Sequence, residues 1–392
     1  MRPRTKPEPL AARESPPSER GFITLAGPRY VALDAFRGIA IAAMILVNTP
    51  GAREHRIAAL RHASWNGCTI ADLIFPAFLF IVGVALWLSL GQATGRGAPR
   101  PQLAAKVLRR AALIFALGVL LNGFPLFEWS HLRIPGILQR IALCYLLASI
   151  FVLTCGVRGL AVAIGALLAA ETALLVLVAV PGATDAFQGP EANVGAVLDN
   201  LLLHRHLLHE GWDPEGLLGT LSATATTLAG VLAGRYWIRT PRPEQRIATL
   251  FAIGTLCVLA GLALAPWLPI NKTLWTASFA IFTCGVSLGM LGLCSWLLDV
   301  RGYRTWAKPF VVYGSNPLLA FMLSELGDKV LWTWMVTTPD GRQRTMHTFI
   351  YDAVFLRVFS DPYASLAYSL VYVALWLLPL GLLYRYRIFV KL

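Results

Sequence analysis

One stretch of the chain combines several reactive side chains. Residues 61–76 read RHASWNGCTIADLIFP, a polar and aromatic loop between two long apolar runs. A histidine, an asparagine and a carboxylate lie within eleven residues there, at His62, Asn66 and Asp72. A neutral imidazole can accept a proton near neutral pH, and a carboxylate can hold the ring in position. The stretch therefore predicts a chemical role for His62.

The neighbouring polar residues have two explanations each. Asp72 begins an apolar run, where an anion favours the helix dipole, or it orients His62. Asn48 ends the preceding run in Asn48-Thr49-Pro50-Gly51, where it caps a turn or stabilises an oxyanion. We take His62, Asn48 and Asp72 as catalytic candidates and Trp65 and Asn66 as candidates for contact with substrate.

The composition indicates an all-α integral membrane protein. Of the 392 residues, 56% are hydrophobic and 14% are charged, whereas soluble domains carry about 25% charged residues. Many runs reach the roughly 20 residues that a membrane-spanning helix needs, and strand-like alternation is absent. We predict ten spans, near 31–49, 69–90, 106–122, 137–155, 159–180, 216–238, 247–266, 273–298, 308–326 and 364–385. The shorter apolar stretches 330–336 and 347–359 leave room for a re-entrant segment or an eleventh span.

The distribution of positive charge predicts the orientation. With ten spans, 22 of the 34 Lys and Arg residues fall on the side of the N-terminus and ten on the other side. Cytoplasmic loops are enriched in these residues, so both termini are expected in the cytoplasm and His62 outside it. The net charge of +13 is then explained by the orientation of the spans in the membrane and by contact with anionic lipid or ligand. Nucleic-acid binding is not needed to account for it. Residues 1–30 are expected to form a disordered cytoplasmic arm without a cleaved signal peptide, and 31–392 a single domain.

Several polar residues in or beside the expected spans are candidates for ligand contact, because charges within a membrane are costly. Asp34 and Arg37 can pair at i, i+3 or line a ligand path. Arg140 can contact a ligand or reach the interface. The further candidates are Gln139, Glu215, Asn271, Trp275 and Asn316 for substrate, and Arg239, Arg385, Arg387 and Lys391 for anionic groups at the cytoplasmic face.

Metal binding is not predicted. His204, His206 and His209 follow an i, i+2, i+5 spacing, which does not place them on one helix face. The six cysteines show no CxxC spacing and are expected to be small core residues.

Three blocks resemble the heparan-alpha-glucosaminide N-acetyltransferase family. The first is LDAFRG at 33–38, Val47-Asn48 and the stretch 61–76; the second is DPEGLLGT at 213–220; the third is PINK at 269–272 with Leu274-Trp275-Thr276. The basic and aromatic tail at 384–391 adds to them. The resemblance covers nearly the whole chain from residue 31, and its first block is the most specific.

The resemblance implies a polytopic acyltransferase that takes acetyl groups from cytosolic acetyl-CoA to an amino sugar across the membrane. It places the catalytic histidine on His62 and the catalytic asparagine on Asn48. The lysosomal member carries a large luminal domain before its first spans, which this chain lacks, so a small sugar acceptor is expected. The bacterial branch, associated with N-acetylglucosamine use, implies an inner-membrane location, and the family makes a homodimer plausible.

Three functions follow from these residues. In the first, acetyl-CoA is bound by Asp34, Arg37 and the basic cytoplasmic residues, and its acetyl group reaches His62. In the second, the chain is an N-acetylglucosamine transporter without acyl transfer, with Asp34, Arg37, Gln139 and Asn316 along the path. In the third, it acetylates a membrane-bound glycan. We favour the first, because the polar residues cluster at one end and no internal repeat is evident.

Overall fold

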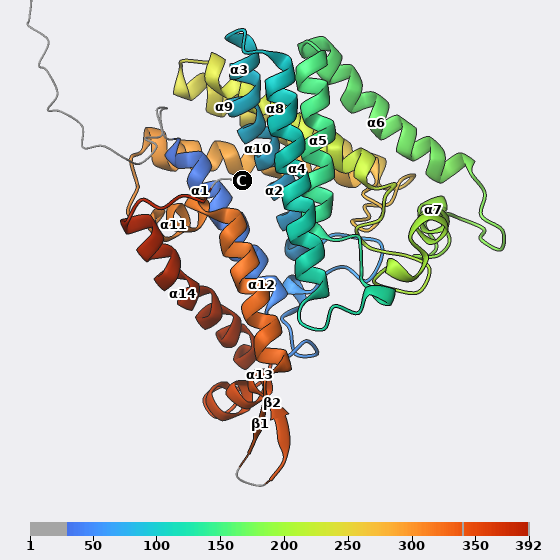
Figure 1. Ribbon diagram of the computed structural model, residues 1–392. Coiled ribbons are helices and arrows are strands. Elements are labelled where there is room, and N and C mark those ends of the chain that lie inside the picture. The colour runs from blue at the N-terminus through green and yellow to red at the C-terminus, as the bar shows by residue number, and fades with distance from the viewer. Residues whose placement is uncertain (1–29, 339–340, 391–392) are drawn as a thin grey trace, which may run out of the picture. The chain divides into compact units, whose positions relative to one another are not determined.

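The computed structural model describes residues 30–338 and 341–390, which are predominantly helical (Figure 1). Those from Val31 onward belong to one compact unit. The α-helices are α1 Val31–Asn48, α2 Ile70–Leu86, α3 Gln92–Gly95, α4 Arg100–Gly123, α5 Ile137–Thr154, α6 Val157–Leu177, α7 Val194–Leu203, α8 Thr220–Arg239, α9 Pro243–Leu264, α10 Ala277–Ser295, α11 Lys308–Ser315, α12 Pro317–Thr333, α13 Met346–Ile350 and α14 Tyr363–Arg385. Short 3₁₀ segments occur at Ala58–Leu60, Trp129–His131 and His204–His206, and π-helical segments at Trp87–Gly91, Trp296–Val300 and Tyr351–Phe355.

Among the described residues, seven helical segments are long and apolar enough to cross a membrane, which supports the all-α membrane class. They are α1, Ile70–Gly95, α5, α6, α9, Ala277–Val300 and α14. The other expected spans also form helices, but α4 begins with a basic half and α12 carries Glu325, Asp328 and Lys329. In α6, α9 and α14 only 22% of the apolar window is buried, against at least 56% in the other four. The faces of α6, α9 and α14 are therefore available to lipid.

The expected ninth span is broken. Asn316 has φ −133° and ψ 57°, and it separates α11 from α12, which begins with Pro317. Beyond α12, the stretch 330–336 forms the end of that helix and part of β1, Met335–Thr337. Strand β1 pairs in antiparallel fashion with β2, Gln343–Thr345. The stretch 347–359 forms α13 and a π-helical segment, so the described part of this region contains no eleventh helix of spanning length.

Glycine allows two helix pairs to approach closely. A Cβ at Gly38 of α1 would lie 1.7 Å from the carbonyl oxygen of Phe310 in α11. A Cβ at Gly83 of α2 would lie 1.9 Å from the carbonyl oxygen of Thr227 in α8. Any larger residue would force these backbones apart, so α1 packs directly on α11 and α2 on α8, in the halves of α1 and α2 that lie away from the loop between them.

Candidate active site

A cavity of about 290 Å³ contains His62, and we call it the His62 cavity. It is lined by the end of α1, the loop before α2, the starts of α2 and α5, and three loop segments that come from distant parts of the chain. Seven of the predicted site residues line it: Asn48, His62, Trp65, Asp72, Arg140, Glu215 and Trp275. Arg133 and Lys272 also line it, and neither was predicted as a site residue.

Asp72 caps α2 and holds His62 at the same time. One carboxylate oxygen, Oδ2, accepts hydrogen bonds from the backbone N–H groups of Ala63 and Thr69, at 3.0 and 3.1 Å, which fixes the start of the helix. The other oxygen, Oδ1, lies 2.7 Å from Nδ1 of His62. The two explanations for Asp72 are therefore compatible. Asp72 is 1% exposed and His62 is 41% exposed, so the carboxylate is shielded while the ring is accessible.

Lys272 is the third charged group of this cluster. Its Nζ lies 3.4 Å from Oδ1 of Asp72 and 3.1 Å from Nδ1 of His62. Nδ1 cannot accept a hydrogen bond from Lys272 while its own N–H donates one to Asp72. An ionised carboxylate only accepts hydrogen bonds, so the arrangement favours Nδ1–H donating to Asp72 and Nε2 remaining free. Burial lowers the pKa of Lys272, against the opposing effect of Asp72 and Glu215.

Asn48 is oriented by a residue far away in the sequence. Its Nδ2 donates a hydrogen bond of 2.8 Å to Oε1 of Glu325 in α12. Because a carboxylate offers no donor, this contact fixes which end of the amide faces α12. One N–H of Asn48 remains for another acceptor at the His62 cavity.

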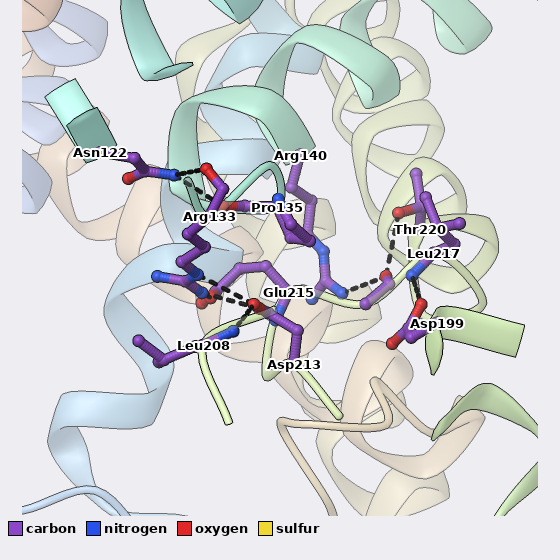
Figure 2. A network of polar contacts seen from close by, with 11 residues as sticks. Asn122, Arg133, Pro135, Arg140, Asp199, Leu208, Asp213, Glu215, Leu217 and Thr220 are labelled. Atoms are coloured by element: carbon purple, nitrogen blue, oxygen red, sulfur yellow. Dashed lines mark hydrogen bonds and ion pairs between the residues drawn. The ribbon is translucent and has the colours of Figure 1, made fainter. Parts of the chain in front are cut away.

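An ion-pair network forms one wall of the His62 cavity (Figure 2). Arg133 bonds to both oxygens of Asp213, at 2.9 and 2.7 Å, and to Glu215 at 2.5 Å. Asp213 is buried and also accepts from the backbone N–H groups of Leu208 and Glu215. The network therefore joins the loop before α5 to the loop before α8. The sequence does not predict the role of Arg133, because its partners Asp213 and Glu215 lie about 80 residues away along the chain.

Arg140 and Trp275 form a second contact in the wall. The Arg140 guanidinium donates to the carbonyl oxygen of Gly216 at 2.7 Å and lies 5.3 Å from the Trp275 ring centroid. Both side chains are buried. Gln139, predicted beside Arg140, lies against α4 at Gly118 and does not line the cavity.

Three predicted substrate contacts support the His62 loop. Nδ2 of Asn271 donates to Oδ1 of Asn66 at 3.1 Å, which ties the loop before α10 to the loop before α2. Asn66 and Trp65 both donate to the carbonyl oxygen of Phe187, at 3.1 and 2.7 Å. These side chains therefore position the segment that carries His62, and only Trp65 among the three lines the cavity.

The predicted residues for anionic groups fall in separate places. Arg37 pairs with Asp34 at 3.3 Å and donates to the carbonyl oxygen of Gly314 at 3.3 Å. Asn316 holds the C-terminal segment after Arg385 and Arg387 through Ile388 and Val390, and it does not line the His62 cavity. Arg239 lines another pocket, and Lys391 lies outside the described residues.

Two of the three histidines at 204–209 make separate local contacts. Nδ1 of His206 lies 2.8 Å from the carbonyl oxygen of Leu132, and His209 stacks on Trp212. Across residues 30–338 and 341–390, no three His, Cys, Asp or Glu side chains are arranged to hold a metal.

Asp199, which supports the loop after Asp213, gives a testable pH dependence. Its Oδ1 accepts from the N–H of Leu217 at 2.8 Å. Burial raises the pKa of this carboxyl to about 6, and Asp213 adds to the effect, against Leu217 and Arg140. The pKa in the unfolded chain is about 3.9, so the contribution of Asp199 to stability is fully present below about pH 3.9 and is lost as the pH rises through about 6.

We therefore expect Asp199→Asn to raise the melting temperature by about 2 °C at pH 7.5 and by about a third of that at pH 4.5. The amide keeps an acceptor for Leu217 and removes the buried charge. Thermal unfolding of the purified protein at both pH values measures this. An equal gain at both, or a loss at pH 7.5, would contradict the assignment.

Comparison with known proteins bears on both the His62 loop and the rest of this site. Residues 29–183 match the family model described as "Heparan-alpha-glucosaminide N-acetyltransferase, catalytic". The heparan-alpha-glucosaminide N-acetyltransferase of Mus musculus is 26% identical over 448 aligned residues, which cover 99% of this chain and 64% of the relative. That of Homo sapiens is 27% identical over 424 residues, which cover 93% and 60%. The predicted resemblance to the heparan-alpha-glucosaminide N-acetyltransferase family is confirmed.

The match divides the site into two parts. The segment that matches the heparan-alpha-glucosaminide N-acetyltransferase catalytic model contains Asn48, His62 and Asp72. Glu215 and Lys272 lie beyond it, in the region aligned only with the two relatives. The chain spans about three fifths of the length of these curated relatives.

Proposed function

We propose that this chain is a transmembrane acetyltransferase that moves an acetyl group from cytosolic acetyl-CoA to an amino sugar on the extracytoplasmic side. The observation that carries the proposal is the His62–Asp72 pair at an accessible cavity, within the segment matched by the catalytic family model. We propose an acceptor of the glucosamine or N-acetylglucosamine type; the relatives' names, which specify a glucosaminide, support an amino sugar.

In the proposed reaction, Nε2 of His62 takes a proton from the acceptor amine or hydroxyl. The acceptor attacks the thioester carbonyl carbon, the C–S bond breaks, and the thiolate of coenzyme A leaves. The proton on His62 returns to that thiolate. Asp72 keeps Nδ1–H oriented throughout, and the free N–H of Asn48 donates to the oxyanion that develops on the carbonyl. Transfer through an acetyl group on His62 uses the same residues in two steps.

The donor would approach from the other end of α1. Arg37 lies near that end, beside α11, and Arg385 and Arg387 precede the segment held by Asn316. Guanidinium groups suit the phosphates of coenzyme A. We propose that Arg37, Arg385 and Arg387 contact these phosphates, together with Lys391 of the same tail. The pantetheine would then extend along α1 toward Asn48.

The sided reaction requires a defined topology. We propose ten spans with both termini in the cytoplasm, a bacterial inner-membrane location, and residues 31–392 as one catalytic domain. A homodimer is compatible with the family. The excess of Lys and Arg on the side of the termini supports this orientation.

Ligand-dependent stability tests the donor directly. Acetyl-CoA at about 100 times its dissociation constant is expected to stabilise the purified protein by roughly 2.7 kcal/mol, since only the folded state binds it. Thermal unfolding with acetyl-CoA and with N-acetylglucosamine is the measurement. Stabilisation by the sugar and none by acetyl-CoA would contradict the proposal and favour the transporter.

A further inference from the structure

A second pocket lies at the opposite end of α2 from His62. It has a volume of about 450 Å³ and is lined by the ends of α2, α5 and α8, by α3, and by the start of α6. We call it the Arg235 pocket. About 15 residues of α2 separate Trp87, in this pocket, from Asp72, in the His62 cavity, which corresponds to roughly 22 Å.

The Arg235 pocket is strongly basic. Arg96, Arg235 and Arg239 line it, and none of the described residues that line it is acidic. Within the part of the chain that the structure describes, no ion pair links these three arginines to a carboxylate. Arg235 and Arg239 are also i, i+4 neighbours on α8, where like charges repel. An anion bound between them would relieve that repulsion.

Two further features favour a phosphate. The Arg235 guanidinium lies over the Trp87 ring, 5.1 Å from its centroid, which holds the side chain in the pocket. The 21-residue helix α6 begins at the pocket with Gly156 and Val157, and no side chain caps it. Its first N–H groups and its dipole add to the positive field of the arginines.

Close packing separates this pocket from the His62 cavity. A Cβ at Gly230 of α8 would lie 2.0 Å from the carbonyl oxygen of Phe80 in α2, so the two backbones touch between the pockets. Leu86, Tyr145 and Val231 belong to a buried core beneath the Arg235 pocket. An acyl donor bound there could not extend along α2 and α8 to His62, which argues against the nucleotide of coenzyme A.

The surroundings fit a lipid instead. Val157 lines the pocket and is exposed, and Val162 on α6 and Ile150 on α5 are further exposed apolar side chains on the helices that build it. Acyl chains can lie along these faces while the headgroup enters the pocket. We propose that the Arg235 pocket binds the phosphate headgroup of an anionic phospholipid, with Arg235 and Arg239 as its main contacts. Basic pockets between helices at the cytoplasmic face are suited to such lipids. Arg239 would then contact lipid rather than acetyl-CoA.

Native mass spectrometry with added lipid tests this site without any acetyl transfer. We expect phosphatidylglycerol to bind at about tenfold lower concentration than phosphatidylcholine. Arg235→Gln/Arg239→Gln should abolish the difference, and Arg205→Gln, an exposed arginine in another loop, should retain it. If the double variant fails to fold, Arg239→Gln alone, at the exposed end of α8, should weaken the preference about threefold.

Competition separates the sources of phosphate. We expect 3′,5′-ADP and inorganic phosphate to leave bound phosphatidylglycerol in place. Displacement by 3′,5′-ADP would overturn the proposal in favour of a nucleotide site. An unchanged lipid preference in a folded Arg239→Gln or double variant would overturn it as well.

Discussion

His62→Ala is expected to lose acetyl transfer by about 10²–10⁴-fold or more, the range that a general base contributes. The ring is accessible from the cavity, and Asp72 holds its other nitrogen at 2.7 Å. No other imidazole lines the cavity among the described residues, so none can replace it. Turnover of acetyl-CoA with an amino sugar, measured on the purified variant, is the test.

The matched control is His131→Ala. His131 is exposed in the 3₁₀ segment Trp129–His131 and does not line the cavity. We expect it to keep wild-type turnover, and both variants to keep the wild-type melting temperature. Near wild-type turnover by His62→Ala would remove His62 from the mechanism. Detection of acetylated His62 by mass spectrometry would identify the two-step route.

Asn48→Ala is expected to lower kcat by about 10²–10³-fold, as the loss of one oxyanion donor typically does. The amide is held by Glu325 at 2.8 Å, which leaves one N–H available at the cavity. The effect should fall on kcat more than on KM, because the oxyanion exists only in the transition state. Steady-state kinetics with both substrates separates the two constants. A rise in KM with unchanged kcat would assign Asn48 to substrate binding instead.

Glu325 supplies the internal control for Asn48. Glu325→Gln keeps an oxygen that can accept from Asn48, and we expect it to retain most activity. Glu325→Ala removes the acceptor, and we expect a loss of about tenfold that largely disappears in the Asn48→Ala background. Fully additive losses would show that Glu325 acts independently of Asn48.

The sequence predicts local contacts better than distant ones. His62 and Asp72 are ten residues apart, and helix capping by Asp72 brings the loop back onto the start of α2. The bonds of Asn48 to Glu325 and of Arg133 to Asp213 cross 277 and 80 residues. These pairs depend on which helices are neighbours, and hydropathy alone does not specify that.

Asn316 illustrates the same limit. Asn-Pro within an apolar run indicates a broken helix, and the structure has the break. The side chain of Asn316 forms hydrogen bonds with the backbone of Ile388 and Val390, which lie more than 70 residues further along the chain. The sequence therefore signals the interruption but not its role in holding the C-terminal segment.

The most direct test of the proposed function is sided acetyl transfer in proteoliposomes of known orientation. Labelled acetyl-CoA is supplied only on the side of the termini, and glucosamine only on the side of His62. We predict labelled N-acetylglucosamine on the His62 side, absent with His62→Ala and retained with His131→Ala. Two results would contradict transfer across the membrane. One is product that forms only when acetyl-CoA and glucosamine are on the same side, and the other is no product while the acetyl-CoA remains unhydrolysed.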